Sequence, residues 1–522
     1  MKLWLHERAW ALLKEQDTLD AGRVMSEHDG LSRAQQGIGD MDPPEFREAA
    51  HDVADTVSDY LERLESFDVL PQLEPGEIRG RLPDAPPERP EPLVKILEDY
   101  RELIQPNVTH WQSPGFMAYF PSVASGPGIL GEWLATGLNS NVMFWKNAPA
   151  STELEERVVD WLRRMLGLPE AFDGMFTDTA SVSSLLSLVA ARHAIPGLNS
   201  RDEGLAGRPG LQRLRIYTSA EAHSSIEKAA VVVGVGRAGV RRIPVDDEYR
   251  MVSRALEQAI AEDRAAGWLP FCVVGTLGTT SSTSIDPAAE LAEICGRERL
   301  WLHIDAAYGG AAAIDPERRV LFAGWEHADS IVFNPHKWLF TPFDASLLLF
   351  RHPDTFRSAF SVVPEYVRGS EVAGAHNYHE YGIQMGRRFR ALKLWMQIRY
   401  FGVGGIVSRI REHCRMAGEL ASWIDADEDW ERLAPVPLST VCFRYRPLSL
   451  AAKDDEQTQN RLDSWNASIL DEVNRSGRYY LSHTRLRERY TLRVALGNPR
   501  AEPRHVKGCW GLLRAAASRV AG

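Results

Sequence analysis

The chain has 522 residues, of which 44% are hydrophobic and 25% are charged, and its formal net charge is -11 at pH 7. This length exceeds what one compact core holds, so we expect roughly two or three folded lobes. The acidic balance disfavours nucleic acid as a partner. No apolar run approaches the ~18 residues that span a bilayer. The five cysteines form no CxxC pair, so we expect no disulfides and a reducing compartment. The first residues lack a secretory pattern, so we expect a cytoplasmic protein without a membrane partner.

The front of the chain reads as an appended segment followed by a helical arm. Residues 1–40 are polar and end in QQGIGD, so we expect them to be poorly ordered. Apolar residues at helical spacing predict a helix over 44–66, and a second helix follows over 93–105 after a proline-rich linker. Because this section has little core of its own, we expect residues 41–125 to pack on a partner subunit.

The middle of the chain alternates between predicted strands and helices. Apolar runs that predict strands cover 213–219, 269–277, 300–305 and 330–334, with helical stretches between them. This alternation predicts an α/β fold with a mostly parallel central sheet over residues 126–400. Ligands of such sheets bind where strands end. Longer helices and separated strands predict a small C-terminal α+β domain over 401–522.

The segment Asn334-Pro335-His336-Lys337-Trp338 follows directly on a predicted buried strand. A lysine at such a position can be desolvated, which lowers its pKa and leaves a neutral amine able to form a Schiff base. The alternative is an exposed loop lysine with no special role. The pentapeptide favours the functional interpretation.

Asp305 ends the strand one βα unit upstream and is followed by small residues. A carboxylate there can pair with a protonated pyridine nitrogen, and Ala307 leaves room for a flat ring. On its own Asp305 could equally be a helix N-cap. Its spacing before Lys337 favours the cofactor interpretation.

Two further patterns are weak alone. Thr179, Ala180 and Ser181 stand at the polar start of an apolar helix, where backbone N–H groups bind phosphate, although any capped helix gives a similar pattern. His223 follows the strand at 213–219 and could stack on a cofactor ring. A lone histidine is more often structural. For His223 the other patterns of the chain favour function.

Together these segments resemble the group II pyridoxal-phosphate decarboxylases, the family of aromatic-L-amino-acid decarboxylases. The resemblance runs from about residue 44 to the C-terminus and rests on these ordered segments: PEFREAAHDVADTV, THWQSPGFMAYFPS, APASTELE, AHSSIEKA, GTLGTTSSTSID, WLHIDAAYGG, FNPHKW and MGRRFRALKLW. It implies the aspartate-aminotransferase-like fold type I of PLP-dependent transferases. It also implies a pyridoxal 5'-phosphate cofactor and a homodimer with active sites at the subunit interface.

The resemblance also assigns roles to individual residues. Lys337 matches the lysine that holds the cofactor, Asp305 the partner of the pyridine nitrogen, and His223 the imidazole stacked on the ring. Thr280 and Ala307 match residues that line the other edges of the cofactor ring. The residues that match those around the cofactor phosphate are Ala180, Ser181, Asn334 and His336, joined by Met385 and Gly386 from the other subunit. The substrate pocket matches Trp111, Tyr119, Phe120, Pro121 and Ser122, with Asn141 and Met143 expected to reach it across the dimer.

The reaction type depends on Tyr366 and His223. Tyr366, in a stretch that resembles a mobile lid, is the candidate proton donor, and the family's oxidative branch commonly replaces one of these two residues. Since both are present, the sequence favours an amine product, with an aldehyde-forming reaction as the alternative. A catalytically inactive binding protein is a third hypothesis, which the intact Lys337, Asp305 and His223 disfavour. The histidines show no HExxH pattern, so no metal site is expected.

The substrate is expected to be an aromatic L-amino acid such as tryptophan, tyrosine, phenylalanine or dopa. Trp111, Tyr119 and Phe120 favour it. Asp178 and Val182 depart from residues common in relatives at the phosphate site. The segment 139–147 is more polar than its aromatic-specific counterparts, and the run ending in Gln384 replaces a more apolar one. A polar or acidic substrate in contact with Lys146 therefore stays open, against the alternative that Lys146 is a solvated surface charge.

Overall fold

A computed structural model describes residues 35, 37, 39–362, 372, 374–453 and 455–521. The chain divides into two units, one made of Pro71–Thr109 with the residues before Asp68, the other of Asp68–Leu70 with the chain from His110 onward. Each unit is described separately below.

The first unit is helical. Its helices are α3 (Pro43–Glu62), α4 (Glu77–Arg81) and α5 (Leu93–Asp99), and α5 continues as a π-helical turn over Tyr100–Ile104. Prolines occupy the first turn of α3, where their missing N–H costs no helical hydrogen bond. The guanidinium of Arg101 donates to Thr56 Oγ1 at 2.7 Å and ties this π-helical turn to α3. Both helices predicted from the spacing of apolar residues are confirmed.

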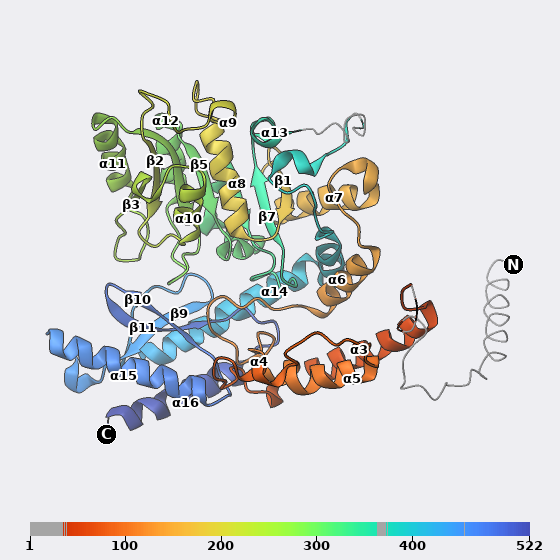
Figure 1. The fold of residues 1–522 in the computed structure, drawn as a ribbon. Coiled ribbons are helices and arrows are strands. Elements are labelled where there is room, and N and C mark those ends of the chain that lie inside the picture. Colours follow the sequence, from red (N-terminus) through yellow and green to blue (C-terminus); the bar gives the residue numbers. More distant parts are fainter. Residues whose placement is uncertain are drawn as a thin grey trace. The chain divides into compact units, whose positions relative to one another are not determined.

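The second unit contains a seven-stranded sheet in the order β1-β7-β6-β5-β4-β2-β3 (Figure 1). The strands are β1 (Asp173–Thr177), β2 (Leu214–Ser219), β3 (Val240–Ile243), β4 (Leu269–Thr276), β5 (Trp301–Asp305), β6 (Ser330–Phe333) and β7 (Ser346–Phe350). Strand β7 is antiparallel to both neighbours, and the remaining pairs are parallel. The predicted mostly parallel sheet is confirmed.

Helices connect and cover these strands. They are α6 (Gly126–Leu138), α7 (Pro149–Met165), α8 (Ala180–His193), α9 (Ser200–Glu203), α10 (Ser225–Val232), α11 (Ser253–Ala265), α12 (Ala288–Glu298) and α13 (Pro353–Phe360). Helix α8 packs against β4, β5, β6 and β7 and against α10, so its N-terminus is fixed relative to the ends of these strands.

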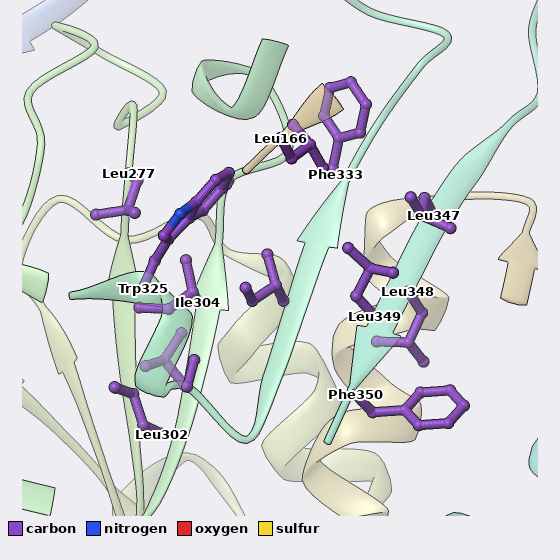
Figure 2. Close-up of a cluster of buried hydrophobic side chains, with 14 of the residues drawn as sticks. Leu166, Leu277, Leu302, Ile304, Trp325, Phe333, Leu347, Leu348, Leu349 and Phe350 are labelled. Carbon is purple, nitrogen blue, oxygen red and sulfur yellow. The ribbon is translucent and has the colours of Figure 1, made fainter. Parts of the chain in front are cut away.

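The core of this sheet explains its sequence pattern. Strands β5, β6 and β7 are buried along their whole length, so they read as continuous apolar runs rather than alternating ones. Figure 2 shows Leu302 and Ile304 of β5 beside Trp325, with Phe333 and Leu349 from the neighbouring strands β6 and β7. This rigid layer sets the positions of the residues that follow each strand.

The C-terminal part forms a smaller sheet with its own core. Helix α14 (Ala391–Asp425) leads into β8 (Trp430–Arg432), β9 (Thr440–Tyr445), α15 (Glu456–Arg475), β10 (Ser482–Leu486), β11 (Arg489–Ala495) and α16 (Pro503–Ala521). The strands pair antiparallel in the order β10-β11-β9-β8, and α15 packs against β9, β11 and α16. The strands predicted near 440 and 490 are confirmed.

Candidate active site

Lys337 lies in the turn that follows β6. Its backbone N–H donates to the carbonyl of Asn334 at 3.0 Å, and its side chain is half-buried with Nζ 5.2 Å from the centroid of the Phe120 ring. Burial lowers the pKa of Lys337; the carboxylate of Asp305 opposes this shift and the charge of Arg493 adds to it. The amine is therefore more readily neutral, as a nucleophile requires.

Asp305 is the last residue of β5, the strand next to β6, and its side chain is buried. Its Oδ1 accepts a hydrogen bond from the backbone N–H of Ala307 at 3.0 Å. The carbonyl of Ala307 in turn accepts from the N–H of Asn334 at 3.1 Å. Adjacent parallel strands thus bring the predicted carboxylate and the predicted lysine to one edge of the sheet.

His223 follows β2, and its side chain is exposed. The N–H of Ser225 donates to His223 Nδ1 at 3.2 Å, so in the neutral ring the proton is on Nε2. The pKa of His223 is lowered, chiefly by burial of part of the ring, while Asp305 raises it and Lys337 lowers it. His223 therefore lies within electrostatic reach of both residues.

His336 and Asn334 shape the turn that carries Lys337. His336 Nδ1 accepts from the N–H of Ala345 at 3.0 Å, and burial together with the charge of Lys337 lowers the pKa of His336 to about 3. The Ser122 hydroxyl donates to the His336 carbonyl at 2.5 Å, which joins the predicted substrate segment to the lysine turn. The side-chain oxygen of Asn334 is buried without a hydrogen-bond partner.

The predicted phosphate residues stand at the N-terminus of α8. Thr179 is the N-cap residue, Ala180 is half-buried and Ser181 is exposed. The carboxylate of Asp178 accepts from the N–H of Thr179 at 2.6 Å, so it uses a donor that an anion could otherwise bind. Thr280 is exposed in the loop after β4.

Phe120 belongs to a ladder of three stacked rings. It stacks on Tyr308 with centroids 3.8 Å apart, and Tyr308 stacks on Trp338 at 4.9 Å. The Tyr308 hydroxyl is 2.6 Å from the hydroxyl of Ser439. Sequence reasoning missed Tyr308, although it stands three residues after Asp305. The neighbouring Pro121 is buried.

A second aromatic group surrounds Trp111. Its ring stacks on Phe116 at 4.2 Å and lies 6.1 Å from that of Tyr119. Tyr119 has a positive φ of 48°, and its hydroxyl is 2.8 Å from that of Tyr480. Trp111 and Tyr119 are exposed, so this group presents aromatic surface next to Phe120.

The residues expected to act across a dimer lie together. The N–H of Arg387 donates to Asn141 Oδ1 at 2.9 Å, directly after Met385 and Gly386, and Asn141 Nδ2 is 3.9 Å from the sulfur of Met143. In the described residues of one chain, no hydrogen bond or ion pair joins this group to Lys337. The structure therefore places Asn141, Met143, Met385 and Gly386 near one another, without such a bond to the lysine. Tyr366 lies outside the described residues.

Arg493 of β11 is a buried residue that sequence reasoning missed. Its Nε donates to the carbonyl of Ser281 at 2.9 Å, Nη1 donates to the carbonyl of Tyr119, and its guanidinium carbon lies 4.6 Å from the centroid of Phe120. Burial lowers its pKa. One charged residue within the buried run YTLRVAL was the available signal.

Comparisons with known proteins agree with this geometry. Residues 75–446 match the family described as the pyridoxal-dependent decarboxylase conserved domain. The chain is 39% identical to phenylacetaldehyde synthase of Arabidopsis thaliana (92% of this chain, 97% of the relative) and 39% identical to tyrosine decarboxylase 2 of Narcissus pseudonarcissus (92% and 95%). The crystal structure of Oryza sativa TDC with PLP and tryptamine matches with a TM-score of 0.87 at 34% identity, covering 92% of this chain and 99% of that one.

Proposed function

Because the chain belongs to the pyridoxal-dependent decarboxylase family and has its fold type I architecture, we propose that it decarboxylates an aromatic L-amino acid to the amine and CO2. The observation that carries the proposal is Lys337, whose Nζ lies 5.2 Å from the centroid of the Phe120 ring and whose pKa is lowered by burial although Asp305 opposes that shift. A lysine that serves only solubility or surface charge has no need of this environment.

The residues present fit pyridoxal 5'-phosphate. Lys337 would hold it, Asp305 would keep its ring nitrogen protonated and His223 would lie against the ring, while the buried, unpartnered oxygen of Asn334 is a polar atom still able to accept a hydrogen bond. The N-terminus of α8 suits the phosphate. When bound, the cofactor supplies an electron sink for the electron pair left by the departing carboxyl group.

The chain's own residues supply position and protons. Lys337 would hold the cofactor, and the Asp305 carboxylate, which interacts electrostatically with Lys337, would balance positive charge at that place. His223, with its Nε2 proton, presents a donor at the same strand edge. Tyr366 is the proposed donor of the proton that replaces the carboxyl group at Cα.

The aromatic substrate class is supported by the side chains at the site. Phe120, Trp111 and Tyr119 offer ring faces suited to an aromatic side chain. Relatives named for tyrosine decarboxylation and a neighbour bound to tryptamine support the same class.

Oxidative formation of an aldehyde is the second candidate, because a relative as similar as the decarboxylases is named phenylacetaldehyde synthase. His223 and Tyr366, which the oxidative branch commonly replaces, favour the amine.

We also propose a homodimer that completes each site. Helix α6 exposes Leu130, Leu134 and Leu138, one apolar stripe at 53%, 55% and 67% exposure. The separate group around Asn141 and Met385 would then serve the partner's lysine. The proposed domains are an appended segment (1–40), the arm (41–125), the cofactor domain (126–400) and the C-terminal domain (401–522).

A cytoplasmic location is proposed from the cysteines. All five are free and buried, as expected in a reducing compartment. Among the described residues, no helix has the length and apolar character needed to cross a membrane.

A product assay tests the function. Purified, cofactor-loaded protein is offered aromatic and acidic L-amino acids while amine, CO2 and peroxide are measured together. Equal amounts of amine and CO2 from an aromatic substrate support the proposal. Peroxide with aldehyde moves the protein to the second candidate, and turnover of acidic substrates alone overturns the substrate class. Lys337→Ala must remove both turnover and the visible absorbance of the bound cofactor.

A further inference from the structure

His303 is a buried histidine of β5 that the candidate active site does not use. Its side chain is fully buried, and it lies two residues before Asp305. Because side chains alternate between the two faces of a strand, His303 and Asp305 point to the same face of the sheet. Buried polar side chains are almost always hydrogen-bonded, so the partners of His303 indicate what is held against that face.

The His303 ring lies between two hydroxyl groups. Its Nδ1 is 2.9 Å from Ser330 Oγ on the neighbouring strand β6, and its Nε2 is 3.1 Å from Ser184 Oγ on helix α8. The indole N–H of Trp301 also donates to Ser330 Oγ, at 2.9 Å. Burial lowers the pKa of His303 to about 4, so at neutral pH the ring has one donor and one acceptor, one for each hydroxyl. His303 therefore joins β5 to α8 by a buried hydrogen bond.

The first part of α8 is also held by a second set of hydroxyl groups. Ser183 Oγ is 2.7 Å from Thr177 Oγ1 at the end of β1 and 2.9 Å from Ser346 Oγ at the start of β7. Ser183 thus ties α8 to one side of the sheet, and Ser184 ties it to the strand of Asp305. Both serines lie close to the N-cap residue Thr179, so these bonds set where the helix begins relative to the strand ends.

The bond between His303 and Ser184 joins the two places that are proposed to hold different parts of pyridoxal 5'-phosphate. Asp305 would bind the ring nitrogen, and the start of α8 would bind the phosphate. One flat ring carries both groups of the ligand, so the ligand fixes the distance between them and the protein must match it. Two binding groups at the matching distance hold one ligand far more tightly than the same two groups at a wrong distance.

We propose that His303 is a positioning residue that, through its bond to Ser184, sets the distance between the phosphate site at the start of α8 and the carboxylate of Asp305. This inference rests on the proposed function, because it takes pyridoxal 5'-phosphate as the cofactor. Loss of the bond leaves the helix N–H groups and the carboxylate in place but at a less suitable distance. The loss should therefore weaken a ligand that needs both groups and spare a ligand that needs one.

Three ligands separate positioning from general stability. The full-length protein, freed of cofactor, is titrated with pyridoxal 5'-phosphate, with pyridoxal, which lacks the phosphate, and with inorganic phosphate as a competitor. Ser184→Ala removes the bond from the helix side. We expect it to weaken pyridoxal 5'-phosphate at least about 5-fold and to leave the other two ligands within about two-fold. Ser187→Ala is the matched control, because this buried serine of α8 donates to the carbonyl of Ser183 within the helix at 3.0 Å, and it should bind all three ligands as wild type does.

Two substitutions of His303 test which ring nitrogen is important. The side-chain amide of glutamine reaches about as far as Nε2 and can keep the bond to Ser184, whereas that of asparagine reaches about as far as Nδ1 and Ser330. His303→Gln should therefore bind pyridoxal 5'-phosphate within about two-fold of wild type, and His303→Asn should lose at least about 5-fold. Urea unfolding of the same proteins measures their stability, so that affinity and stability are compared variant by variant.

Other outcomes overturn the proposal. Equal weakening of all three ligands by Ser184→Ala makes the bond structural, and weakening of inorganic phosphate as much as pyridoxal 5'-phosphate assigns it to the phosphate site alone. Unchanged binding of pyridoxal 5'-phosphate shows that α8 keeps its place without the bond. The proposed function is judged separately by the product assay on the wild-type enzyme, so turnover of an aromatic substrate with unchanged cofactor affinity in Ser184→Ala removes the inference alone.

Discussion

The indole Nε1 of Trp338 donates a hydrogen bond to Nδ1 of His413 at 3.0 Å, and Trp338 directly follows Lys337. Because Nδ1 accepts, the neutral imidazole has its proton on Nε2, which donates to the carbonyl of Asn498 at 2.9 Å. The Asn498 side chain donates to the carbonyl of Ser113 at 2.8 Å. Three distant segments, including the predicted substrate segment, are thus joined behind the lysine turn.

Replacing His413 with leucine should destabilise the fold. The change leaves the buried Trp338 Nε1 without an acceptor, at a cost of about 1–3 kcal/mol in the free energy of unfolding. His413→Gln offers an amide oxygen and an amide N–H in the same region, so its loss should be smaller. Urea unfolding followed by fluorescence compares the two variants. A leucine variant as stable as the glutamine variant would contradict the role of this hydrogen bond.

His413 should also make stability depend on pH. Burial lowers its pKa to about 4 in the folded protein, against about 6.5 in the unfolded chain. Between these values the unfolded state binds more protons, so stability rises with pH there and is lost as pH falls from about 6.5 toward 4. The advantage of wild type over His413→Gln should therefore be smaller at pH 5 than at pH 7. Urea midpoints at both pH values measure it, and an advantage that grows at pH 5 is incompatible with this sign.

The buried ion pair between Glu155 and Arg387 should be more important than an exposed one. Glu155→Gln leaves the Arg387 guanidinium buried with weaker partners, which typically costs about 3–5 kcal/mol. The exposed pair of Arg415 with Glu412 gives the control, since Glu412→Gln should cost no more than about 1 kcal/mol. Denaturant unfolding of both variants tests the difference, and equal losses would refute it. Since Arg387 N–H also binds Asn141, Glu155→Gln should reduce activity as well.

His223 should set the acid limb of the rate profile. Its lowered pKa keeps the ring neutral at neutral pH, so kcat/KM should fall only as pH drops below about 6.5, when the ring becomes protonated. His223→Asn removes the titrating group and should flatten that limb while lowering kcat/KM by about 100-fold or more. The measurement is kcat/KM from pH 5 to 8 for both proteins. An unchanged acid limb in the variant would assign it to another group.

The sequence predicts those site residues that can be recognised from their immediate neighbours in the chain. Asp305 and Lys337 were found because Asp305 ends a buried strand and Lys337 closely follows one, and the parallel register of β5 and β6 places both at the same end of the sheet. Strand β7 was not predicted, because its run SLLLF is short and buried throughout and lacks a period that separates strand from helix.

Contacts between residues far apart in the chain limit what the sequence can predict about the site. Arg493 belongs to the second sheet and Tyr308 follows β5 of the first, so no spacing in the chain indicates that both contact Phe120. The group of Asn141 and Gly386 was found through a resemblance, and its use of a neighbouring subunit stays a prediction.

The glycine that follows Tyr308 should be required for the edge of the sheet where the candidate site lies. A Cβ at Gly309 would lie 2.2 Å from the carbonyl oxygen of Leu277, a backbone atom that cannot turn away. Gly309→Ala should therefore force apart the ends of β4 and β5, costing about 1–3 kcal/mol in unfolding free energy and reducing cofactor retention. Gly418→Ala is the control, because a Cβ there meets no atom within 4 Å and alanine favours the helix α14 by about 0.5–1 kcal/mol. Thermal unfolding and cofactor absorbance after dialysis measure both effects, and a Gly309→Ala protein that matches wild type in both would show that the strand ends can separate without loss.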